Sequence, residues 1–265
     1  RPQFFHRVQV GVGADGMPAA WRSTIVCQSL LKGTPFEVTM KDGIDSSSVE
    51  GTVDSPYVTD LANHAVELHT PDSPVTVLWL RSVGHTHTAF VMESVIDELA
   101  HAAKVDPLEY RRRLLAKHPR HLGVLNLAAE KAGWGTPLAA GRARGLAVHE
   151  SFGSYVATVV EVSVSGTTIR VHRAVMAVDC GICVNPAGVE AQMEGGAVYG
   201  LSAALFGEIT LREGRVQQGN FDGYPVLRLT EMPRVETFIV PSAEKPGGIG
   251  EPGVPPIAPA VANAV

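Results

Sequence analysis

The chain has 265 residues, of which 45% are hydrophobic and 18% are charged, and its formal net charge is -5. These values indicate a globular protein with a substantial core, and the lack of a basic stripe argues against a nucleic-acid-binding protein. No apolar run is long enough to cross a bilayer as a helix. Because the sequence starts at Arg1 rather than Met and ends at Val265 inside a helical pattern, we expect a piece of a longer polypeptide.

The first quarter of the sequence predicts extended structure. Apolar and polar residues alternate there, and a hairpin turn at Asp15-Gly16 joins the first two of the segments predicted as strands, which are residues 4–11, 19–28 and 66–68. The composition changes around residues 70–74. We therefore predict a strand-rich first subdomain over residues 1–74 and a second subdomain over residues 75–265.

Beyond this boundary, blocks of strands alternate with blocks of helices. An apolar run predicts a strand over residues 75–80, and the apolar residues that follow recur at helical steps of three and four. A second helix starts at Asp106-Pro107, and a third ends before Gly133. Strands, one long helix and strands again are then predicted, over residues 144–149, 155–164, 167–178, 186–204, 206–212 and 234–240. Segregated blocks of this kind predict an α+β fold, with mixed sheets and helices packed against them.

Near the end of the sequence, one carboxylate stands among glycines and prolines. This is Glu251, inside the segment from Pro246 to Pro256. Glycines permit the close approach of a ligand, and prolines restrict the remaining backbone conformations. Residues 257–265 predict a buried helix, so Glu251 would lie just ahead of a helix N-terminus, which favours its ionised form. Two interpretations follow: a fixed general base, or a tight loop that carries an exposed glutamate.

Two further segments combine glycine with polar residues. Gln192 precedes Gly195 and Gly196 inside a predicted helix, where each glycine costs roughly 1 kcal/mol relative to alanine. Either another helix or a ligand must approach closely there. The loop Arg81-Ser82-Val83-Gly84 lies between a predicted strand and a predicted helix, and backbone amides at such a helix start form an anion pocket.

Histidine and cysteine pairs give weaker signals. His85 and His87 could bind a metal, but we favour polar loop residues because no third ligand stands at a defined spacing. Cys180 and Cys183 form a lone C-x-x-C after an apolar strand, and we expect two buried or half-buried thiols rather than a zinc or redox site. The sequence lacks the G-x-x-x-x-G-K motif, which argues against ATP as a ligand.

The order of these segments resembles the large subunits of the molybdenum hydroxylases, the xanthine dehydrogenase and aldehyde oxidoreductase family. The likeness is strongest toward isoquinoline 1-oxidoreductase beta subunits, covers essentially the whole chain, and corresponds to the C-terminal part of such a subunit. The motifs that carry it are Arg81-Ser82-Val83-Gly84 with the following E-x-x-x-D-E-x-A helix, Asp179-Cys180-Gly181 with Asn185-Pro186, Gln192-Met193-Glu194-Gly195-Gly196, and Gly248-Ile249-Gly250-Glu251-Pro252.

This resemblance implies a fold whose two subdomains bind a molybdopterin cofactor. It implies that Glu251 is the catalytic base in the hydroxylation of an N-heteroaromatic compound or the oxidation of an aldehyde, with water as the oxygen source. It implies no direct protein ligand to the metal. The residues expected to border the cofactor are Arg81, Ser82, Val83, Gly84, Gln192, Gly195, Gly196, Gly248 and Gly250.

Two departures from the family pattern narrow the expected chemistry. Ser82 stands where copper-dependent carbon monoxide dehydrogenases carry a cysteine, so oxidation of carbon monoxide is not expected. Val83 stands where the xanthine branch carries an aromatic residue, so a purine substrate is not supported either.

The resemblance also implies partners. The chain has no cysteine cluster for iron and sulfur, so a small [2Fe-2S] subunit is expected to remove electrons, with a cytochrome c as a candidate acceptor. The cofactor is expected in its cytosine dinucleotide form and only in the complete subunit, so the fragment alone would be inactive, with Glu251 on a mobile, exposed loop. The localisation is left open, with a periplasmic or membrane-associated complex preferred to a cytoplasmic one. Two other functions stay open: a cofactor-free assembly domain, and a metal hydrolase that uses His85, His87 and a carboxylate.

Overall fold

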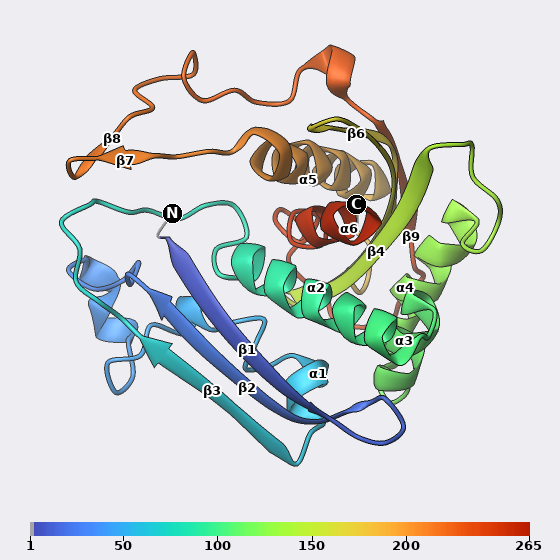
Figure 1. Cartoon of the computed structure of the whole chain (residues 1–265), viewed down its shortest axis with the longest axis horizontal. Coiled ribbons are helices and arrows are strands. Elements are labelled where there is room, and N and C mark those ends of the chain that lie inside the picture. Colours follow the sequence, from blue (N-terminus) through green and yellow to red (C-terminus); the bar gives the residue numbers. More distant parts are fainter. Residues whose placement is uncertain (1–2) are drawn as a thin grey trace.

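The computed structural model describes residues 3–265 and shows two main sheets with helices packed around them (Figure 1). The strands of this part are β1 (Phe4–Val12), β2 (Pro18–Cys27), β3 (Asn63–His69), β4 (Arg142–Ser151), β5 (Ser154–Ser165), β6 (Thr168–Asp179), β7 (Leu211–Arg212), β8 (Arg215–Val216) and β9 (Arg234–Ile239). Its α-helices are α1 (Pro56–Thr59), α2 (His85–Ala103), α3 (Pro107–Leu114), α4 (Pro119–Ala132), α5 (Pro186–Phe206) and α6 (Ile257–Ala264). The predicted α+β class is confirmed.

The first sheet consists of β1, β2 and β3 in that order, with β2 antiparallel to β1 and parallel to β3. The predicted hairpin is confirmed, because the chain reverses at Asp15-Gly16 and Gly16 has a φ of 78°. Trp21 and Ile25, which lie on alternate positions of β2, are buried, as the period-two pattern predicts. The division into subdomains 1–74 and 75–265 stays a prediction.

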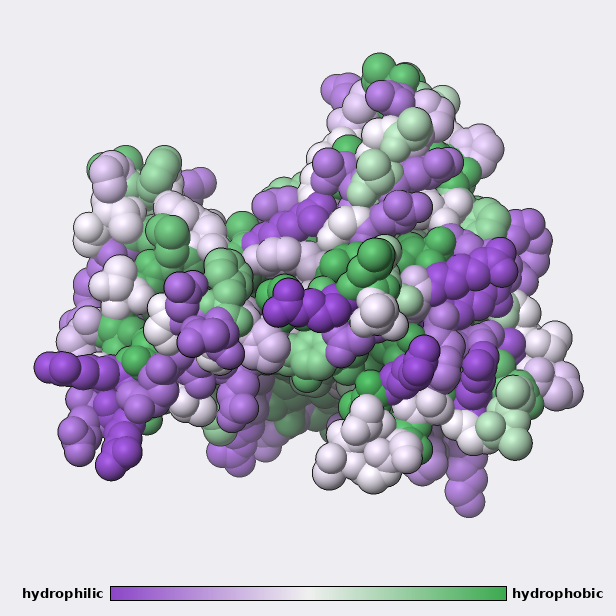
Figure 2. All heavy atoms as spheres, turned by 90° about the horizontal axis from the view of Figure 1, so that it is seen from above, coloured by the Kyte–Doolittle hydropathy of each residue, from purple (hydrophilic) through white to green (hydrophobic). Residues whose placement is uncertain are grey.

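Two predicted strands are wrong or largely wrong. Residues 75–80 form an irregular surface segment, because no neighbouring strand of the described chain offers its edge to them, and Leu78 is 65% exposed. Within residues 206–212, only β7 is extended, since Phe206 still belongs to α5. The segment between α5 and β9, which contains β7 and β8, lies at the upper side of Figure 1. Figure 2 views the molecule from above, and hydrophobic and hydrophilic residues are mixed on this face.

The three helices α2, α3 and α4 follow the sequence signals closely. Asp106 caps α3 by accepting two backbone N–H groups, at 2.9 and 3.1 Å, and Gly133 ends α4 with a φ of 65°. The fully buried guanidinium of Arg111, on α3, binds Glu93 at 2.8 Å and Asp97 at 2.9 Å on α2. This ion-pair network fixes α3 against the helix that begins at the Arg81 loop.

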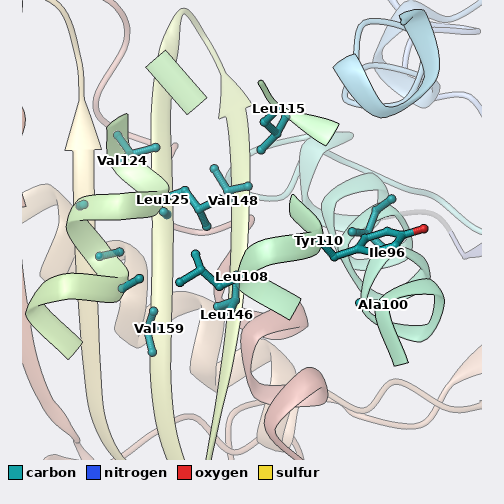
Figure 3. Close-up of a cluster of buried hydrophobic side chains, with 14 of the residues drawn as sticks. Ile96, Ala100, Leu108, Tyr110, Leu115, Val124, Leu125, Leu146, Val148 and Val159 are labelled. Carbon is teal, nitrogen blue, oxygen red and sulfur yellow. The ribbon is translucent and has the colours of Figure 1, made fainter. Parts of the chain in front are cut away.

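The second sheet has the order β4-β5-β6-β9, antiparallel except for β9, which is parallel to β6. Val159 of β5 packs in the core with α4, in which Figure 3 shows Leu125 beside Val148 and Val159 further along the sheet, whereas Val156 packs in the core with α5 and α6. Helices thus cover both faces, which explains why β5 is apolar along most of its length. None of the helices within residues 3–265 combines the length and apolar character needed to cross a bilayer.

Candidate active site

The loop ahead of α2 has an unusual backbone. Ser82 and Val83 have φ values of 74° and 46°, in the left-handed region that residues with side chains rarely adopt. Such a conformation costs roughly 1–3 kcal/mol per residue and persists only where the surroundings hold it. Thr86 Oγ1 supports the turn by donating to Arg81 O at 3.0 Å, and the turn leaves Ser82 fully buried.

Arg81 joins three segments that are far apart in the sequence. Its Nε donates to Gly250 O at 2.7 Å, and Nη2 contacts the same carbonyl. Nη2 also donates to Oε1 of Gln192, on α5, at 2.9 Å. Ser82 Oγ donates to Glu251 O at 2.7 Å. The structure therefore brings together the loop, the helix and the glycine-rich segment that the sequence singles out.

Glu251 lies in a firmly held turn. Its side chain is half-buried, Val254 N–H donates to its carbonyl at 3.0 Å, and the next five residues, 252–256, are buried. The expectation of full exposure is wrong for Glu251, which is half-buried and whose carbonyl accepts a hydrogen bond from Ser82; the expected mobility stays a prediction. Its carboxylate takes part in no hydrogen bond or ion pair with residues 3–265. The buried helix predicted over residues 257–265 is confirmed as α6, which starts six residues after Glu251, and the effect of its N-terminus on Glu251 stays a prediction.

Two of the predicted cofactor-bordering glycines make room for the protein itself. A Cβ on Gly196 would lie 3.0 Å from Cα of Gly253, so this glycine lets the segment after Glu251 pack on α5. A Cβ on Gly248 would lie 2.9 Å from Cβ of Phe152, and Gly248 N–H donates to Phe152 O at 2.7 Å. Both positions have a packing reason for glycine.

Gly195 and Gly250 differ from this pair because both are exposed and uncrowded. A Cβ would lie 3.7 Å from Arg81 Nη1 at Gly195 and 4.0 Å from Gln192 Oε1 at Gly250. These are ordinary contact distances, so the protein alone does not require glycine there. The two positions leave bare backbone on either side of Arg81 and Gln192.

The helix start that the sequence predicts as an anion pocket holds a carboxylate of the chain itself. Gly84 N–H donates to Glu50 Oε1 at 2.7 Å, and Ser47 O lies against the Gly84 Cα, where a side chain would not fit. The prediction of an open anion pocket is therefore wrong for this amide. Burial raises the pKa of Glu50 to about 7, although the Gly84 N–H favours its ionised form. Sequence reasoning missed Glu50 because it stands in a turn-rich segment without a motif.

The two histidines considered as metal ligands point to different neighbours. His85 Nδ1 lies 2.9 Å from His149 Nε2. His87, in contrast, stacks on Phe4 with ring centroids 3.5 Å apart, and its Nδ1 lies 2.9 Å from His6 Nε2. Burial lowers the pKa of His85 to about 4. In the part of the chain that the structure describes, no group of three His, Cys, Asp or Glu residues is arranged to hold a metal ion.

The C-x-x-C segment supports the glycine-rich segment from the other side. Cys180 is buried and Cys183 half-buried, and both are free thiols, as the sequence predicts. Gly247 N–H donates to Cys180 O at 2.9 Å, and Ile182 N–H donates to Glu244 O at 2.9 Å. These bonds attach residues 244–247 to the end of β6.

In this α+β domain, a strained loop, a helix and a glycine-rich segment thus converge beside the carboxylate of Glu251, as residues of a ligand-binding site do. Two family models described as molybdopterin cofactor-binding domain match the chain, over residues 86–233 and residues 1–115. The chain belongs to this family.

Individual proteins support the same assignment. The chain is 34% identical over 210 residues to the isoquinoline 1-oxidoreductase subunit beta of Brevundimonas diminuta, covering 77% of this chain and 27% of that protein. It is 34% identical over 208 residues to the membrane-bound aldehyde dehydrogenase (pyrroloquinoline-quinone) of Gluconacetobacter polyoxogenes, covering 71% and 27%. It thus spans about a quarter of these relatives.

The fold is similar to that of quinoline 2-oxidoreductase from Pseudomonas putida 86, with a TM-score of 0.76 and 13% sequence identity. The match covers 99% of this chain and 58% of that one. At this identity the likeness concerns the fold.

The residues around Arg81 fit a flat, polar cofactor such as a pterin. Gly195 and Gly250 expose backbone that such a group could approach, and Gln192 is exposed on the same side. Because Oε1 of Gln192 accepts from Arg81, its amide N–H groups stay available as donors within residues 3–265. Gln192, Gly195 and Gly250 would hold the pterin, whereas Gly196 and Gly248 would support it indirectly.

Proposed function

We propose that this chain is part of the large subunit of a molybdenum hydroxylase, which hydroxylates an N-heteroaromatic compound or oxidises an aldehyde with water as the oxygen source. The family of cofactor-binding domains and the names of the relatives, which refer to isoquinoline, quinoline and an aldehyde, support this proposal. The molybdopterin cofactor follows from the family models rather than from the quinone in one relative's name.

One observation carries the catalytic part. Arg81 and Ser82 donate to the carbonyls of Gly250 and Glu251, so the loop before α2 fixes the main chain on both sides of the Gly250–Glu251 peptide. Within residues 3–265, the carboxylate of Glu251 has no hydrogen-bond or ion-pair partner, and it extends from a segment that these two hydrogen bonds hold. A base held in this way loses little conformational freedom when it acts.

The proposed mechanism assigns proton transfer to the chain and electron transfer to the cofactor. When bound, the molybdenum cofactor supplies the two-electron redox chemistry. Glu251 acts as the general base and takes up the proton of the water-derived nucleophile while that nucleophile attacks an electron-poor carbon. Gln192 would offer its amide N–H groups to the pterin, and Arg81 holds the side chain of Gln192 and the carbonyl of Gly250 in place through its hydrogen bonds.

The proposal extends to partners. The cofactor would carry a cytosine dinucleotide, and a small [2Fe-2S] subunit would accept the electrons and pass them on, with a cytochrome c as a possible final acceptor. A periplasmic or membrane-associated complex is the favoured location, and one relative is named as membrane-bound.

The test uses the complete protein. Glu251→Gln should retain molybdenum and pterin but lower turnover by roughly 10²–10⁴-fold, the usual contribution of a general base. Glu244→Gln is the matched control, because Glu244 is an exposed carboxylate on the same segment. Unchanged turnover of Glu251→Gln would reject the assignment.

The two other functions have separate outcomes. A cofactor-free assembly domain would give complete protein that contains no extractable pterin. The metal hydrolase loses its basis, since His85 and His87 contact different neighbours.

A further inference from the structure

Two carboxyl-bearing residues from opposite ends of the chain are attached to the same loop. Ser82 Oγ donates to the main chain of Glu251 at 2.7 Å, and Gly84 N–H donates to the side chain of Glu50 at 2.7 Å. Ser82 and Gly84 are only two residues apart, so Glu50 and Glu251 are neighbours around one turn. Their charges are close enough to influence each other.

Few groups can compensate a second negative charge at this turn. The same turn-rich segment contributes Asp45 and Asp54, whose negative charges also raise the pKa of Glu50. From α2, His85 Nε2 lies 3.8 Å from Glu50 Oε2, and behind it His149 of β4 contacts His85. Burial lowers the pKa of both histidines, so both are neutral at pH 7.

The arginine of the same loop forms its hydrogen bonds elsewhere. Arg81 directs its guanidinium to Gly250 O and Gln192 Oε1. Within residues 3–265, Glu50 forms no ion pair with lysine or arginine. Two carboxylates without a cation between them do not both ionise readily, and burial favours the protonated form of Glu50.

On the basis of the function proposed above, we propose that Glu50 is a positioning residue for Glu251: it holds a proton in slightly acidic solution and releases it around neutral pH, so that only then does a second negative charge arise beside the proposed base. A protonated Glu50 still accepts the Gly84 N–H through its carbonyl oxygen, so the loop keeps its shape. Burial raises the pKa of Glu50 to about 7, which agrees with a release around neutral pH. When Glu50 ionises at higher pH, it adds a second negative charge beside the proposed base, which should alter turnover.

The first experiment is the pH dependence of kcat/KM of the complete, cofactor-loaded enzyme. The unmodified enzyme should show an ionisation near pH 7 that is absent in Glu50→Gln, because glutamine keeps the acceptor for Gly84 but cannot titrate. Glu231→Gln is the matched control, since the exposed Glu231 also accepts a backbone N–H, that of Arg228, at 2.8 Å. The same ionisation in Glu50→Gln would overturn the proposal.

A second experiment does not depend on turnover. The melting temperature of the complete protein is measured against pH for the unmodified chain, Glu50→Gln and Glu251→Gln. Removing the charge of Glu251 should move the Glu50 transition toward acid by a few tenths of a pH unit, and an unmoved transition would overturn the proposal. If Glu251→Gln retains full turnover but moves this transition, the proposed function fails and the charge coupling stands. If it loses turnover without moving the transition, only the coupling fails.

Discussion

The two adjacent glycines of α5 should respond in opposite ways to the same substitution. Alanine at either position gains up to about 1 kcal/mol of helix propensity relative to glycine. At Gly195 the new Cβ meets only Arg81 Nη1, at 3.7 Å, so Gly195→Ala should be stabilising. At Gly196 the new Cβ lies 3.0 Å from the main chain of Gly253, and such overpacking costs roughly 1–3 kcal/mol. Because the propensity gain is common to both variants, their difference measures the overpacking alone.

Calorimetry of the complete protein measures this difference. For a folded unit of 150–250 residues, 1 kcal/mol changes Tm by about 2–4 °C, so Gly195→Ala should melt roughly 2–12 °C above Gly196→Ala. Gly123→Ala, in α4, is the control for propensity, since a Cβ there meets nothing within 4 Å. Equal melting temperatures for the Gly195 and Gly196 variants would refute the packing argument. A lower pterin content in the more stable Gly195→Ala would support contact with the cofactor.

Three other predictions concern the buried charges and the loop. Arg111→Met should lower the free energy of unfolding by about 3–5 kcal/mol, because Glu93 stays buried without its partner. Urea denaturation measures this loss, and the double variant with Glu93→Gln should recover part of it. No recovery in the double variant would contradict the ion-pair explanation. Arg81→Lys keeps the positive charge but loses the planar guanidinium, which binds Gly250 O and Gln192 Oε1 together, so it should reduce turnover and pterin content. Full retention of turnover and pterin content would show that a single hydrogen bond from residue 81 is enough. Because the pKa of Glu50 rises from 4.5 to about 7 on folding, its contribution to stability is complete below pH 4.5 and is lost by pH 7, a change of up to about 3 kcal/mol. The pKa of His85 falls from 6.5 to about 4 on folding, so the contribution of His85 to stability is lost as the pH falls, opposite to that of Glu50. The free energy of unfolding is therefore compared between the unmodified protein and Glu50→Gln at each pH. An identical pH dependence of the two proteins would contradict this account.

Local chemistry made much of this fold predictable. Capping by Asp106, the left-handed Gly133 and the hairpin at Asp15-Gly16 are decided by neighbouring residues, and all three are confirmed. The strand predicted over residues 75–80 failed because a strand needs a partner edge, which its own residues do not encode.

The candidate site was predictable in its members but not in its contacts. The sequence indicated that Arg81, Gln192 and Glu251 belong together, and the structure shows the first two in contact. It gave no sign that Gly196 serves packing whereas Gly195 stays open, because this depends on the path of residues 252–256. Glu50 was missed for the same reason, since its importance comes from its contact with Gly84 and not from its neighbours in sequence.

The partners of Arg81 have a consequence for biosynthesis. Gly250 lies 169 residues after Arg81, and Gln192 lies 111 residues after it. A growing chain can form the first sheet and α2 early, but the loop before α2 finds its partners only when synthesis has passed Glu251. Any cofactor that depends on these contacts must therefore be inserted into a chain whose translation has passed this point, which makes loading a late step in the life of the protein.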